Sequence, residues 1–476
     1  MSRINLMPFN RMVVDIPQRI NEWDRVCRQY LPVSYDESIW RFSRIQTADE
    51  PDQGWKLHVS ATIHSATRIL ERIGPFLTSS GVLFKGPKTM EELARLNTGK
   101  FYGYTQIGKC FTIYPKAPQD FVRLANQLHE LTTDFDAPVI PFDRRFKTKS
   151  CVFYRYGSFK RMRMHDDNGV EMPALQCPSG ELVPDSRLSV GDEHDWVTDP
   201  FGKSDSSDLL AKPDSLLKTR FQVFKALSQR GKGGVYWAVD ISGPKPKLCV
   251  LKEGRKHGEI AWDGRDGYWR IQEEAKVLQE VQCLKIDAPC FYGTFYEGAN
   301  VYLAKEFIPG VSLEKLLSSR KRRLKISHVI KYSVQLALIL SRLHAARWIW
   351  RDCKPSNLIV SQRGKLRPID FESASRTGEH DPVQLGTLTY LPEDFAIEMA
   401  QPAHPATDLY AMGVVIYYLL TGVFPSSAQG ENAMEHRKHI PSSILNILSG
   451  LLHSDPSKRP SARLVAKKLA GSLPKV

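Results

Sequence analysis

The chain has 476 residues, which is long enough for two or three domains, each with its own hydrophobic core. A hydrophobic content of 42% and a charged content of 25% are typical of a globular protein, and no uncharged apolar run is long enough to predict a membrane span. The net charge of +14 favours anionic partners such as phosphates or acidic peptides. Because no nucleic-acid-binding motif accompanies this charge, we expect no nucleic-acid partner.

The cysteines and the N-terminus indicate a cytoplasmic protein. The eight cysteines form no Cys-x-x-Cys pair and no Cys/His cluster with the spacing of zinc ligands. Residues 1–10 lack the basic segment and apolar core of a secretory signal. We therefore expect a reducing environment and no structural metal.

The first chemically informative stretch is residues 54–63, after a helix expected over residues 16–30. Apolar and polar side chains alternate along it, and this period of two predicts a half-buried strand. The alternation places Lys56 and His58 side by side on the polar face. A Lys-x-His pair of this kind is, on its own, most often a solvated sheet face.

Further cations follow on neighbouring predicted elements. Residues 81–84 form a short apolar strand that ends in Lys85, and partial desolvation there would lower the pKa of the lysine toward that of a usable base. Residues 108–115 predict another strand, which carries Lys109. A basic cluster then includes Arg144, Arg145 and Arg155. Such clusters are usually solvated, but beside a lysine and a histidine they would suit phosphate binding.

Residues 55–60, 108–115, 154–157 and 184–187 resemble the N-terminal lyase domain of class III lanthipeptide synthetases. That domain is similar to bacterial phosphothreonine lyases, which share the Lys-x-His strand. The resemblance implies β-elimination of phosphate from phosphoserine or phosphothreonine, which leaves a dehydroamino acid. An α-proton is weakly acidic, so this chemistry needs a neutral amine within a concentrated positive field.

The same resemblance implies a role for each candidate residue. Lys85 would remove the α-proton, His58 would protonate the departing phosphate, and Lys56 would stabilise the enolate-like charge. The phosphate would be bound by Arg144 or Arg145 together with Arg155, with Lys109 as an additional candidate.

Residues 160–220 are rich in turn formers, so we place a domain boundary near residue 210. The hairpin that follows carries Gly231, Gly233 and Gly234, whose backbone N–H groups could approach phosphates and which would keep the loop flexible. Ser228 and Arg230 interrupt the glycine pattern, so the motif alone is no stronger than an ordinary glycine hairpin.

A second set of chemical groups lies after an apolar helix expected over residues 326–343. Asp352 could accept the proton of an attacking hydroxyl, Lys354 could neutralise charge on a moving phosphoryl group, and Asn357 could hold a magnesium ion. Asp370, in an Asp-Phe-Glu tripeptide, would supply the second metal contact. In this order and spacing these residues resemble the catalytic and metal-binding loops of protein kinases.

The kinase resemblance implies roles for other positions. Lys252 on a strand would contact the nucleotide phosphates, with Glu274 as its helix partner and Glu273 as the second choice. Glu306 and Ile308 would form the hinge against the base, and Gly231 and Gly233 would cover the phosphates. The implied cofactors are ATP or GTP and Mg²⁺. Residues 385–393 would form the peptide-substrate loop, and Asp408 would brace the catalytic loop by hydrogen bonds.

Two positions depart from the usual kinase pattern. Trp350 replaces the customary histidine, and we expect it to serve packing. Glu372 replaces the customary glycine, but Asp-Phe-Glu is usual in lanthipeptide synthetase kinases, as is an insertion like residues 254–268. The second departure therefore strengthens the resemblance to that family.

Together these features predict an α+β chain, with a phosphothreonine-lyase-like domain over residues 1–210 and a two-lobed protein-kinase fold over residues 211–476. The expected function is that of a bifunctional dehydratase acting on a precursor peptide with a leader segment. We expect no cyclase domain, so thioether closure would be absent or done by a separate cyclase protein. The alternatives are a regulatory or effector kinase–lyase acting on folded proteins and a peptide-binding pseudokinase.

Overall fold

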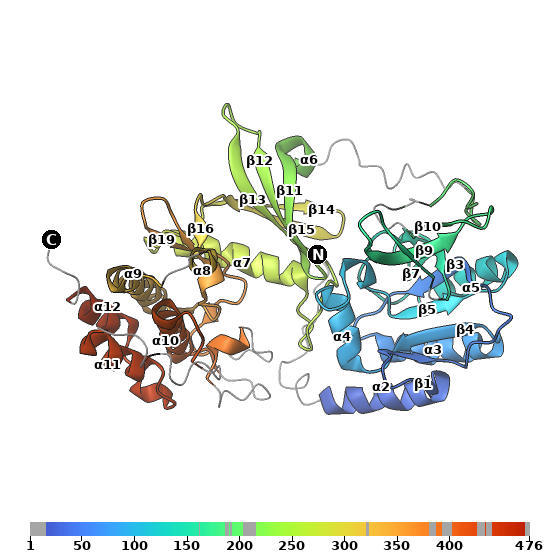
Figure 1. The fold of residues 1–476 in the computed structure, drawn as a ribbon, viewed down its shortest axis with the longest axis horizontal. Helices are drawn as coiled ribbons and strands as arrows, with labels where there is room; N and C mark the ends of the chain where they lie inside the picture. The colour runs from blue at the N-terminus through green and yellow to red at the C-terminus, as the bar shows by residue number, and fades with distance from the viewer. Residues whose placement is uncertain are drawn as a thin grey trace. The chain divides into compact units, whose positions relative to one another are not determined.

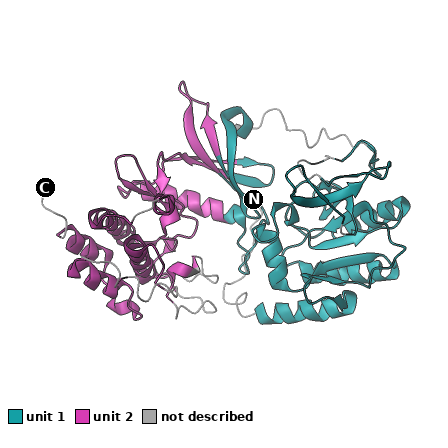
Figure 2. Cartoon of the chain, in the orientation of Figure 1, with its two compact units in different colours: residues 1–236, 252–269, 296–301 teal, residues 237–251, 270–295, 302–476 magenta. Residues whose placement is uncertain are grey.

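The computed structural model describes residues 16–160, 162–185, 190, 193–202, 216–319, 323–379, 387–392, 402–425, 434 and 440–471. By internal contacts the chain divides into two compact units (Figure 2). The first comprises residues 1–236, 252–269 and 296–301, and the second comprises residues 237–251, 270–295 and 302–476. The domain boundary predicted near residue 210 lies outside the described residues.

The first unit is built on a seven-stranded antiparallel sheet with the order β1-β2-β4-β5-β3-β7-β6 (Figure 1). Its strands are β1 (Val33–Ser34), β2 (Trp40–Phe42), β3 (Gln53–Val59), β4 (Leu83–Pro87), β5 (Phe111–Tyr114), β6 (Arg144–Arg145) and β7 (Val152–Ser158). The helices are α2 (Ile16–Tyr30), α3 (Ala66–Ser79), α4 (Met90–Thr98) and α5 (Pro118–Leu131), with a 3₁₀ turn η1 (Tyr104–Gln106).

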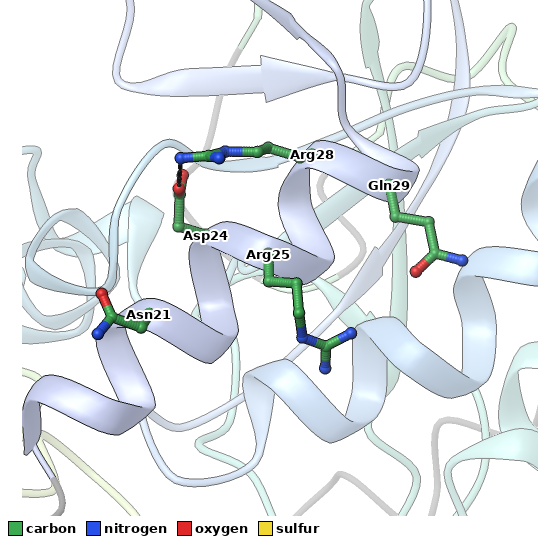
Figure 3. Close-up of a pocket in the computed structure, with 5 residues that line it drawn as sticks. All are labelled: Asn21, Asp24, Arg25, Arg28 and Gln29. Atoms are coloured by element: carbon green, nitrogen blue, oxygen red, sulfur yellow. Dashed lines mark hydrogen bonds and ion pairs between the residues drawn. The ribbon is translucent and has the colours of Figure 1, made fainter.

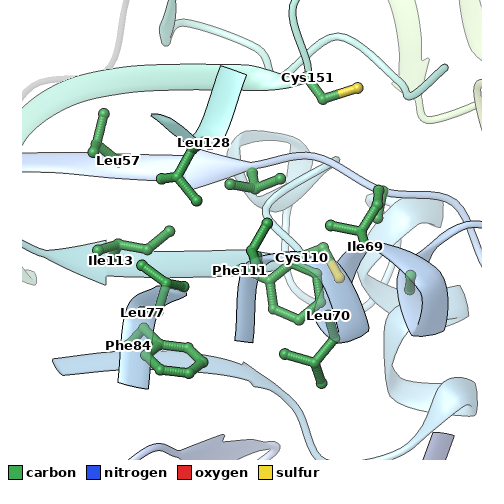
Figure 4. Packing of buried hydrophobic residues seen from close by; sticks show 14 of the residues in the cluster. Leu57, Ile69, Leu70, Leu77, Phe84, Cys110, Phe111, Ile113, Leu128 and Cys151 are labelled. Carbon is green, nitrogen blue, oxygen red and sulfur yellow. The ribbon is translucent and has the colours of Figure 1, made fainter. Parts of the chain in front are cut away.

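One face of this sheet is apolar and buried. Leu57 of β3, Phe84 of β4 and Ile113 of β5 pack with residues of α2, α3 and α5 in one continuous core, part of which Figure 4 shows. Because side chains alternate along a strand, the residues between these apolar positions lie on the opposite face. The polar side chains at the alternate positions of β3, β4 and β5 therefore share the face that is turned away from the helices.

A smaller antiparallel sheet accompanies the first, with the order β10-β9-β8. Its strands are β8 (Arg163–His165), β9 (Glu171–Gln176) and β10 (Leu182–Pro184).

The second half of the chain begins with α6 (Leu216–Arg220) and a five-stranded sheet with the order β11-β12-β13-β15-β14 (Figure 1). The strands are β11 (Phe221–Arg230), β12 (Gly233–Asp240), β13 (Lys247–Gly254), β14 (Phe291–Glu297) and β15 (Asn300–Glu306), and the helix between β13 and β14 is α7 (Gly267–Gln282). Sheet-rich structure is then replaced by mainly helical structure, which confirms the predicted fold class.

The helical part contains α8 (Leu313–Ser318), α9 (Ile326–Ala345), α10 (Pro405–Thr421), α11 (Ser442–Leu451) and α12 (Ala462–Ala470). Short strands and 3₁₀ turns connect them: β16 (Val311–Ser312), β17 (Trp348–Ile349), η3 (Pro355–Asn357), β18 (Leu358–Val360), β19 (Leu366–Pro368), β20 (Ser375–Arg376), η4 (Leu388–Tyr390) and η5 (Pro456–Lys458). Within the described ranges, no helix combines the length and apolar character that crossing a membrane requires.

Candidate active sites

The strand register brings the predicted lyase residues to one face of the seven-stranded sheet. His58 of β3 lies opposite Thr112 of β5, and Thr112 lies opposite Lys85 of β4. On the other side of β3, Lys56 lies opposite Arg155 of β7. Directly opposed residues of an antiparallel pair share a face, so these five side chains occupy the face that the helices leave uncovered.

His58 belongs to a buried three-residue network. Its Nδ1 lies 2.6 Å from Oδ2 of Asp143, and Nζ of Lys109 lies 3.0 Å from Oδ1 of the same carboxylate. Burial lowers the pKa of His58 to about 3, against the opposing influence of Asp143. Burial alone would raise the pKa of Asp143, but Lys109 and His58 together hold it well below its ordinary value. The imidazole is therefore neutral, donates through Nδ1–H to the carboxylate and keeps the lone pair on Nε2.

Lys85 meets the electrostatic requirement for a base. Burial, followed by the charge of Lys109, lowers the pKa of its amine to about 8. Its Nζ also lies 4.3 Å from the ring centroid of Trp40. A usable fraction of neutral amine is therefore present near neutral pH. The lysine lies in the middle of β4 (Leu83–Pro87), not at the end of a strand as the sequence predicted.

The three candidate phosphate arginines lie in different environments. Arg155 is buried and ion-paired with Asp185, which belongs to the 184–187 segment that carried the resemblance. Arg145 lies opposite Phe153 of β7, and Phe153 lies opposite His58 of β3, so Arg145 is on the same face of the sheet as His58. Arg144 lies opposite Tyr154, a core residue, which places it on the other face.

The structure does not bring Arg144 to the proposed phosphate site. Its guanidinium is 2.7 Å from Glu193 and 2.7 Å from Asp199, so two carboxylates already neutralise it. The reason is the two-residue period of the strand, which separates adjacent arginines onto opposite faces. Of the two alternatives left open by the sequence, Arg145 is the one that the register favours.

Asp143 is the main residue that sequence reasoning missed in this site. It directly precedes the two arginines, and a single carboxylate beside a basic pair carries no recognisable pattern. Only the pairing of β6, β7 and β3 brings this segment beside His58.

A separate surface hollow lies on α2, lined by Asn21, Asp24, Arg25, Arg28 and Gln29 (Figure 3). Arg28 lies 2.5 Å from Asp24, and Arg25 lies 3.0 Å from Glu71 on α3. None of the predicted site residues lines it, and because its charges neutralise each other we assign it no chemistry.

The glycine hairpin differs from the expectation of a flexible loop. The backbone N–H of Gly231 donates to the carbonyl oxygen of Thr98, 3.0 Å away, and a Cβ at Gly231 would lie 1.7 Å from the carbonyl oxygen of Asn97. A Cβ at Gly233, whose φ is +147°, would lie 1.8 Å from the carbonyl oxygen of Glu253. These glycines are required because backbone segments pass too close for a side chain.

The insertion over residues 254–268 packs within the first unit. Nε2 of His64 lies 2.8 Å from the carbonyl oxygen of Ala261, and Trp262 packs against the core of the seven-stranded sheet. The guanidinium of Arg255 lies 5.1 Å from the ring centroid of Tyr104. The insertion thus joins the hairpin to the surface of the preceding domain.

In the second unit the predicted catalytic loop residues converge. Nδ2 of Asn357 donates to Oδ2 of Asp352 at 2.7 Å, and Nζ of Lys354 lies 2.8 Å from the same carboxylate. Thr387, from the predicted peptide-substrate loop, donates to Oδ1 of Asp352 at 3.0 Å and accepts from Lys354 at 3.0 Å. Asn357 and Lys354 thus hold Oδ2, Thr387 holds Oδ1, and the carboxylate stays partly exposed to a reacting hydroxyl.

Asp408, in the first turn of α10, fixes the backbone of this loop. Its carboxylate accepts the backbone N–H groups of Trp350 at 2.8 Å and Arg351 at 2.7 Å, and it also lies 2.9 Å from Nε2 of His344. The prediction that Asp408 braces the catalytic loop is confirmed.

Three carboxylates gather at the predicted metal position. Ligand atoms of Glu274, Asp370 and Glu372 all lie within 4.8 Å of one another. Oxygen donors of this kind fit Mg²⁺, a hard cation. Glu274 is fully buried on α7 and accepts Nζ of Lys305 at 2.6 Å, whereas the second choice, Glu273, pairs with the exposed Lys276. Burial therefore favours Glu274 over Glu273 for the helix position.

The remaining predicted nucleotide contacts lie on β13 and at the end of β15. Lys252 is buried on β13, and Ile308 is buried just beyond β15. The carboxylate of Glu306 is held by the guanidinium of Arg367 through two contacts of 2.9 Å. The side chain of Glu306 is thus part of the scaffold, so any contact that it makes with a nucleotide base would come from its backbone.

Comparisons with known proteins agree with this two-part organisation. Residues 31–212 match the family described as RamC, N-terminal domain, and residues 225–469 match the protein kinase domain family. The chain is 29% identical over 357 residues to a probable SapB synthase of Streptomyces coelicolor, which covers 72% of this chain and 38% of that protein.

Serine/threonine-protein kinases give further matches. The chain is 29% identical to kinase PknA of a Nostoc species, over 46% of this chain and 40% of that protein. It is 31% identical to kinase F of a Synechocystis species, over 44% of this chain and 45% of that protein. The match thus spans less than half the length of each of these curated relatives.

Proposed function

Because the chain belongs to the protein kinase family and carries a RamC N-terminal domain ahead of its kinase domain, as class III lanthipeptide synthetases do, we propose that it is a bifunctional peptide dehydratase. The kinase would phosphorylate Ser or Thr of a precursor peptide with a leader segment. The lyase would then eliminate phosphate to leave dehydroalanine or dehydrobutyrine. A separate cyclase protein would act on that product if thioethers are formed.

The observation that supports the lyase activity is that the predicted lyase side chains share one face of the seven-stranded sheet. A lysine with a lowered pKa and a neutral histidine share that face with Lys56 and Arg155. A base has to be neutral to accept a proton, and a phosphate has to be met by positive charge. An ordinary solvated sheet face has no reason to place a buried histidine and a buried arginine beside two partly buried lysines.

In the proposed elimination, one proton is removed from Cα and another is given to the leaving phosphate. Nζ of Lys85 takes the α-proton, the C–H electron pair forms the Cα=Cβ double bond, and the Cβ–O bond breaks with its electron pair leaving on phosphate. His58 gives the leaving oxygen a proton. Because the imidazole is neutral beforehand, its Nε2 has to take that proton from solvent when the phosphate dianion binds, since a nearby negative charge raises the pKa of a histidine.

In the kinase half, Asp352 would accept the proton of the substrate hydroxyl, and Lys354 would neutralise charge on the transferred phosphoryl group. Asn357 and Asp370 would hold Mg²⁺, which supplies charge neutralisation on the phosphates of ATP or GTP when bound. The nucleotide would be bound by Gly233, Lys252, Glu274 and the backbone at Glu306 and Ile308. Gly231, also expected there, already donates its backbone N–H to Thr98.

The convergence of Lys354, Asn357 and Thr387 on Asp352 makes the pseudokinase alternative less favourable. A regulatory kinase–lyase that acts on folded proteins would use the same two sites. The two functions differ in substrate, so only the substrate can separate them.

Mass spectrometry of synthetic Ser/Thr peptides incubated with ATP and Mg²⁺ tests the proposal. We expect gain of phosphate followed by a product that has lost one water relative to the starting peptide. Asp352→Asn should abolish phosphorylation, whereas Lys85→Ala and His58→Ala should accumulate phosphopeptide. Dehydrated product formed at the wild-type rate by both lyase variants would overturn the lyase assignment. Activity on folded proteins alone would favour the regulatory alternative.

A further inference from the structure

Trp350 makes a hydrogen bond that the expectation of a packing role does not include. Its side chain is fully buried, and its indole Nε1–H donates to the backbone carbonyl oxygen of Asp370 at 2.8 Å. Its ring also stacks on Phe371, with centroids 5.7 Å apart and an interplanar angle of 29°. The indole therefore contacts two consecutive residues of the Asp-Phe-Glu segment.

Asp370 has a backbone conformation that needs support. Its φ is +67°, in the left-handed region that residues other than glycine adopt only at a cost in energy. A hydrogen-bond donor to the carbonyl oxygen of Asp370 fixes the orientation of the peptide that follows Asp370. That oxygen accepts the hydrogen bond that the indole N–H of Trp350 donates.

Trp350 is itself fixed from the other side. Its backbone N–H donates to Asp408, which is fully buried on α10 and also accepts the backbone N–H of Arg351. A continuous chain of hydrogen bonds thus runs from the Asp408 carboxylate through Trp350 to Asp370. The same carboxylate that braces the catalytic loop is connected to the residue proposed to hold the metal.

We propose that Trp350 is a positioning residue, whose indole N–H holds the Asp370 backbone so that the Asp370 carboxylate faces the metal position beside Glu372. This inference rests on the proposed kinase function. A tryptophan that only filled space could be replaced by another large aromatic ring. A tryptophan that positions Asp370 could be replaced only by a residue that also offers a ring N–H.

Two substitutions separate these roles. Trp350→Phe keeps an aromatic ring for the stack on Phe371 but removes the donor. Trp350→His, which introduces the customary kinase residue, keeps a ring N–H but removes more of the buried apolar surface. If Trp350 only packs, activity should follow thermal stability, and the phenylalanine variant should be better in both. If Trp350 positions Asp370, the two orders should be opposite.

The matched control is Trp348→Phe. Trp348 is also buried, and its indole N–H donates at 3.2 Å to Glu280, which lies outside the proposed chemistry. The same loss of one indole donor there should leave phosphorylation within about twofold of the unaltered protein, because no catalytic group depends on it.

Three measurements decide the matter: the phosphorylation rate, the melting temperature, and the affinity for Mn²⁺ measured by electron paramagnetic resonance with a non-hydrolysable ATP analogue. For Trp350→Phe we expect about a tenfold lower rate and about a tenfold weaker Mn²⁺ affinity, the effect of one lost hydrogen bond. Trp350→His should recover most of both despite a lower melting temperature.

Unchanged Mn²⁺ affinity in Trp350→Phe would overturn the proposal, and so would losses that follow the melting temperatures of the variants. The Mn²⁺ measurement needs no peptide, so it tests Trp350 even if the peptides tried are not substrates. Failure of the unaltered protein to phosphorylate any peptide would count against the proposed function alone.

Discussion

The environment of Lys85 would set the pH dependence of the proposed elimination. A lysine accepts a proton only in its neutral form, which predominates above its pKa of about 8. At pH 7 about one Lys85 amine in ten is neutral. Because bound phosphate keeps His58 protonated, we expect kcat at saturating synthetic phosphopeptide to rise about tenfold per pH unit below pH 8 and to level off above it.

The control for this pH profile is Lys85→Arg, which keeps the positive charge but cannot become neutral in this range. It should fold and still bind phosphopeptide while eliminating phosphate at no measurable rate at any pH. A pH-independent rate between pH 6.5 and pH 8 in the unaltered protein would contradict Lys85 as the base.

Asp143 should be as important to the elimination as the residues named from the sequence. Asp143→Asn removes the carboxylate that accepts Nδ1–H of His58 and allows the other tautomer, so Nε2 would no longer be the site that exchanges protons. We expect the elimination rate to fall about a hundredfold or more. Phosphorylation by the same molecules, followed by accumulation of phosphopeptide in mass spectra, provides the internal control.

A structural cost accompanies this substitution and can be separated from it. Lys109 would lose its buried counter-ion, which typically destabilises a protein by about 3–5 kcal/mol. The double variant Asp143→Asn with Lys109→Met should regain melting temperature without regaining elimination. Recovery of the rate in the double variant would show that Asp143 only balances charge.

At the scale of the elements, sequence patterns predicted the strands and helices well where one face is buried. The helix expected over residues 16–30 coincides with α2, and the alternation over residues 54–63 places Lys56 and His58 correctly on the polar face of β3. The strand itself ends at Val59, although the backbone N–H of Ser60 still donates to the carbonyl oxygen of Cys151. The alternation of apolar and polar residues continues to residue 63, so it could not show where the strand ends.

Sequence patterns could not predict contacts between residues that are far apart in the chain and meet only through strand pairing or loop packing. The separation of Arg144 from Arg145 follows from the register of β6 against β7, and Asp143 meets His58 only through the same sheet. The indole hydrogen bond of Trp350 likewise joins two loops that are twenty positions apart in the sequence. In each case the residue type was visible, but its partner was not.

The glycine hairpin gives a prediction at this scale. A methyl group at Gly231 would collide with the backbone of Asn97, and backbone cannot move aside as a side chain can. We expect Gly231→Ala to lower the free energy of unfolding by about 1–3 kcal/mol. The change in denaturant midpoint would measure it.

Gly243→Ala is the matched control, because a Cβ there would lie 3.9 Å from its nearest neighbour, the carbonyl oxygen of Lys245. It should leave the midpoint nearly unchanged. Equal midpoints for the two variants would show that the hairpin is not held against α4 in solution and would restore the interpretation of a flexible loop.

For the whole molecule, the two proposed phosphate-handling sites in one chain would mean that the intermediate need not be released. Lys85→Ala retains the proposed kinase site, and Asp352→Asn retains the proposed lyase site, so a mixture of the two should still dehydrate a peptide. In the mixture, however, every phosphopeptide has to dissociate from one molecule and bind another. A shared chain raises the effective concentration of the intermediate at the second site, and the mixture lacks this advantage.

The two cases can be separated by a competing phosphopeptide. We expect an excess of unlabelled synthetic phosphopeptide to suppress dehydration of a labelled peptide strongly in the mixture and about tenfold less in the unaltered protein, with labelled product counted by mass spectrometry. Equal suppression would mean that the intermediate always escapes into solution. The presence of both domains in one chain would then contribute to their joint synthesis and not to transfer of the phosphopeptide, because a freely diffusing intermediate gains nothing from the covalent link between the sites.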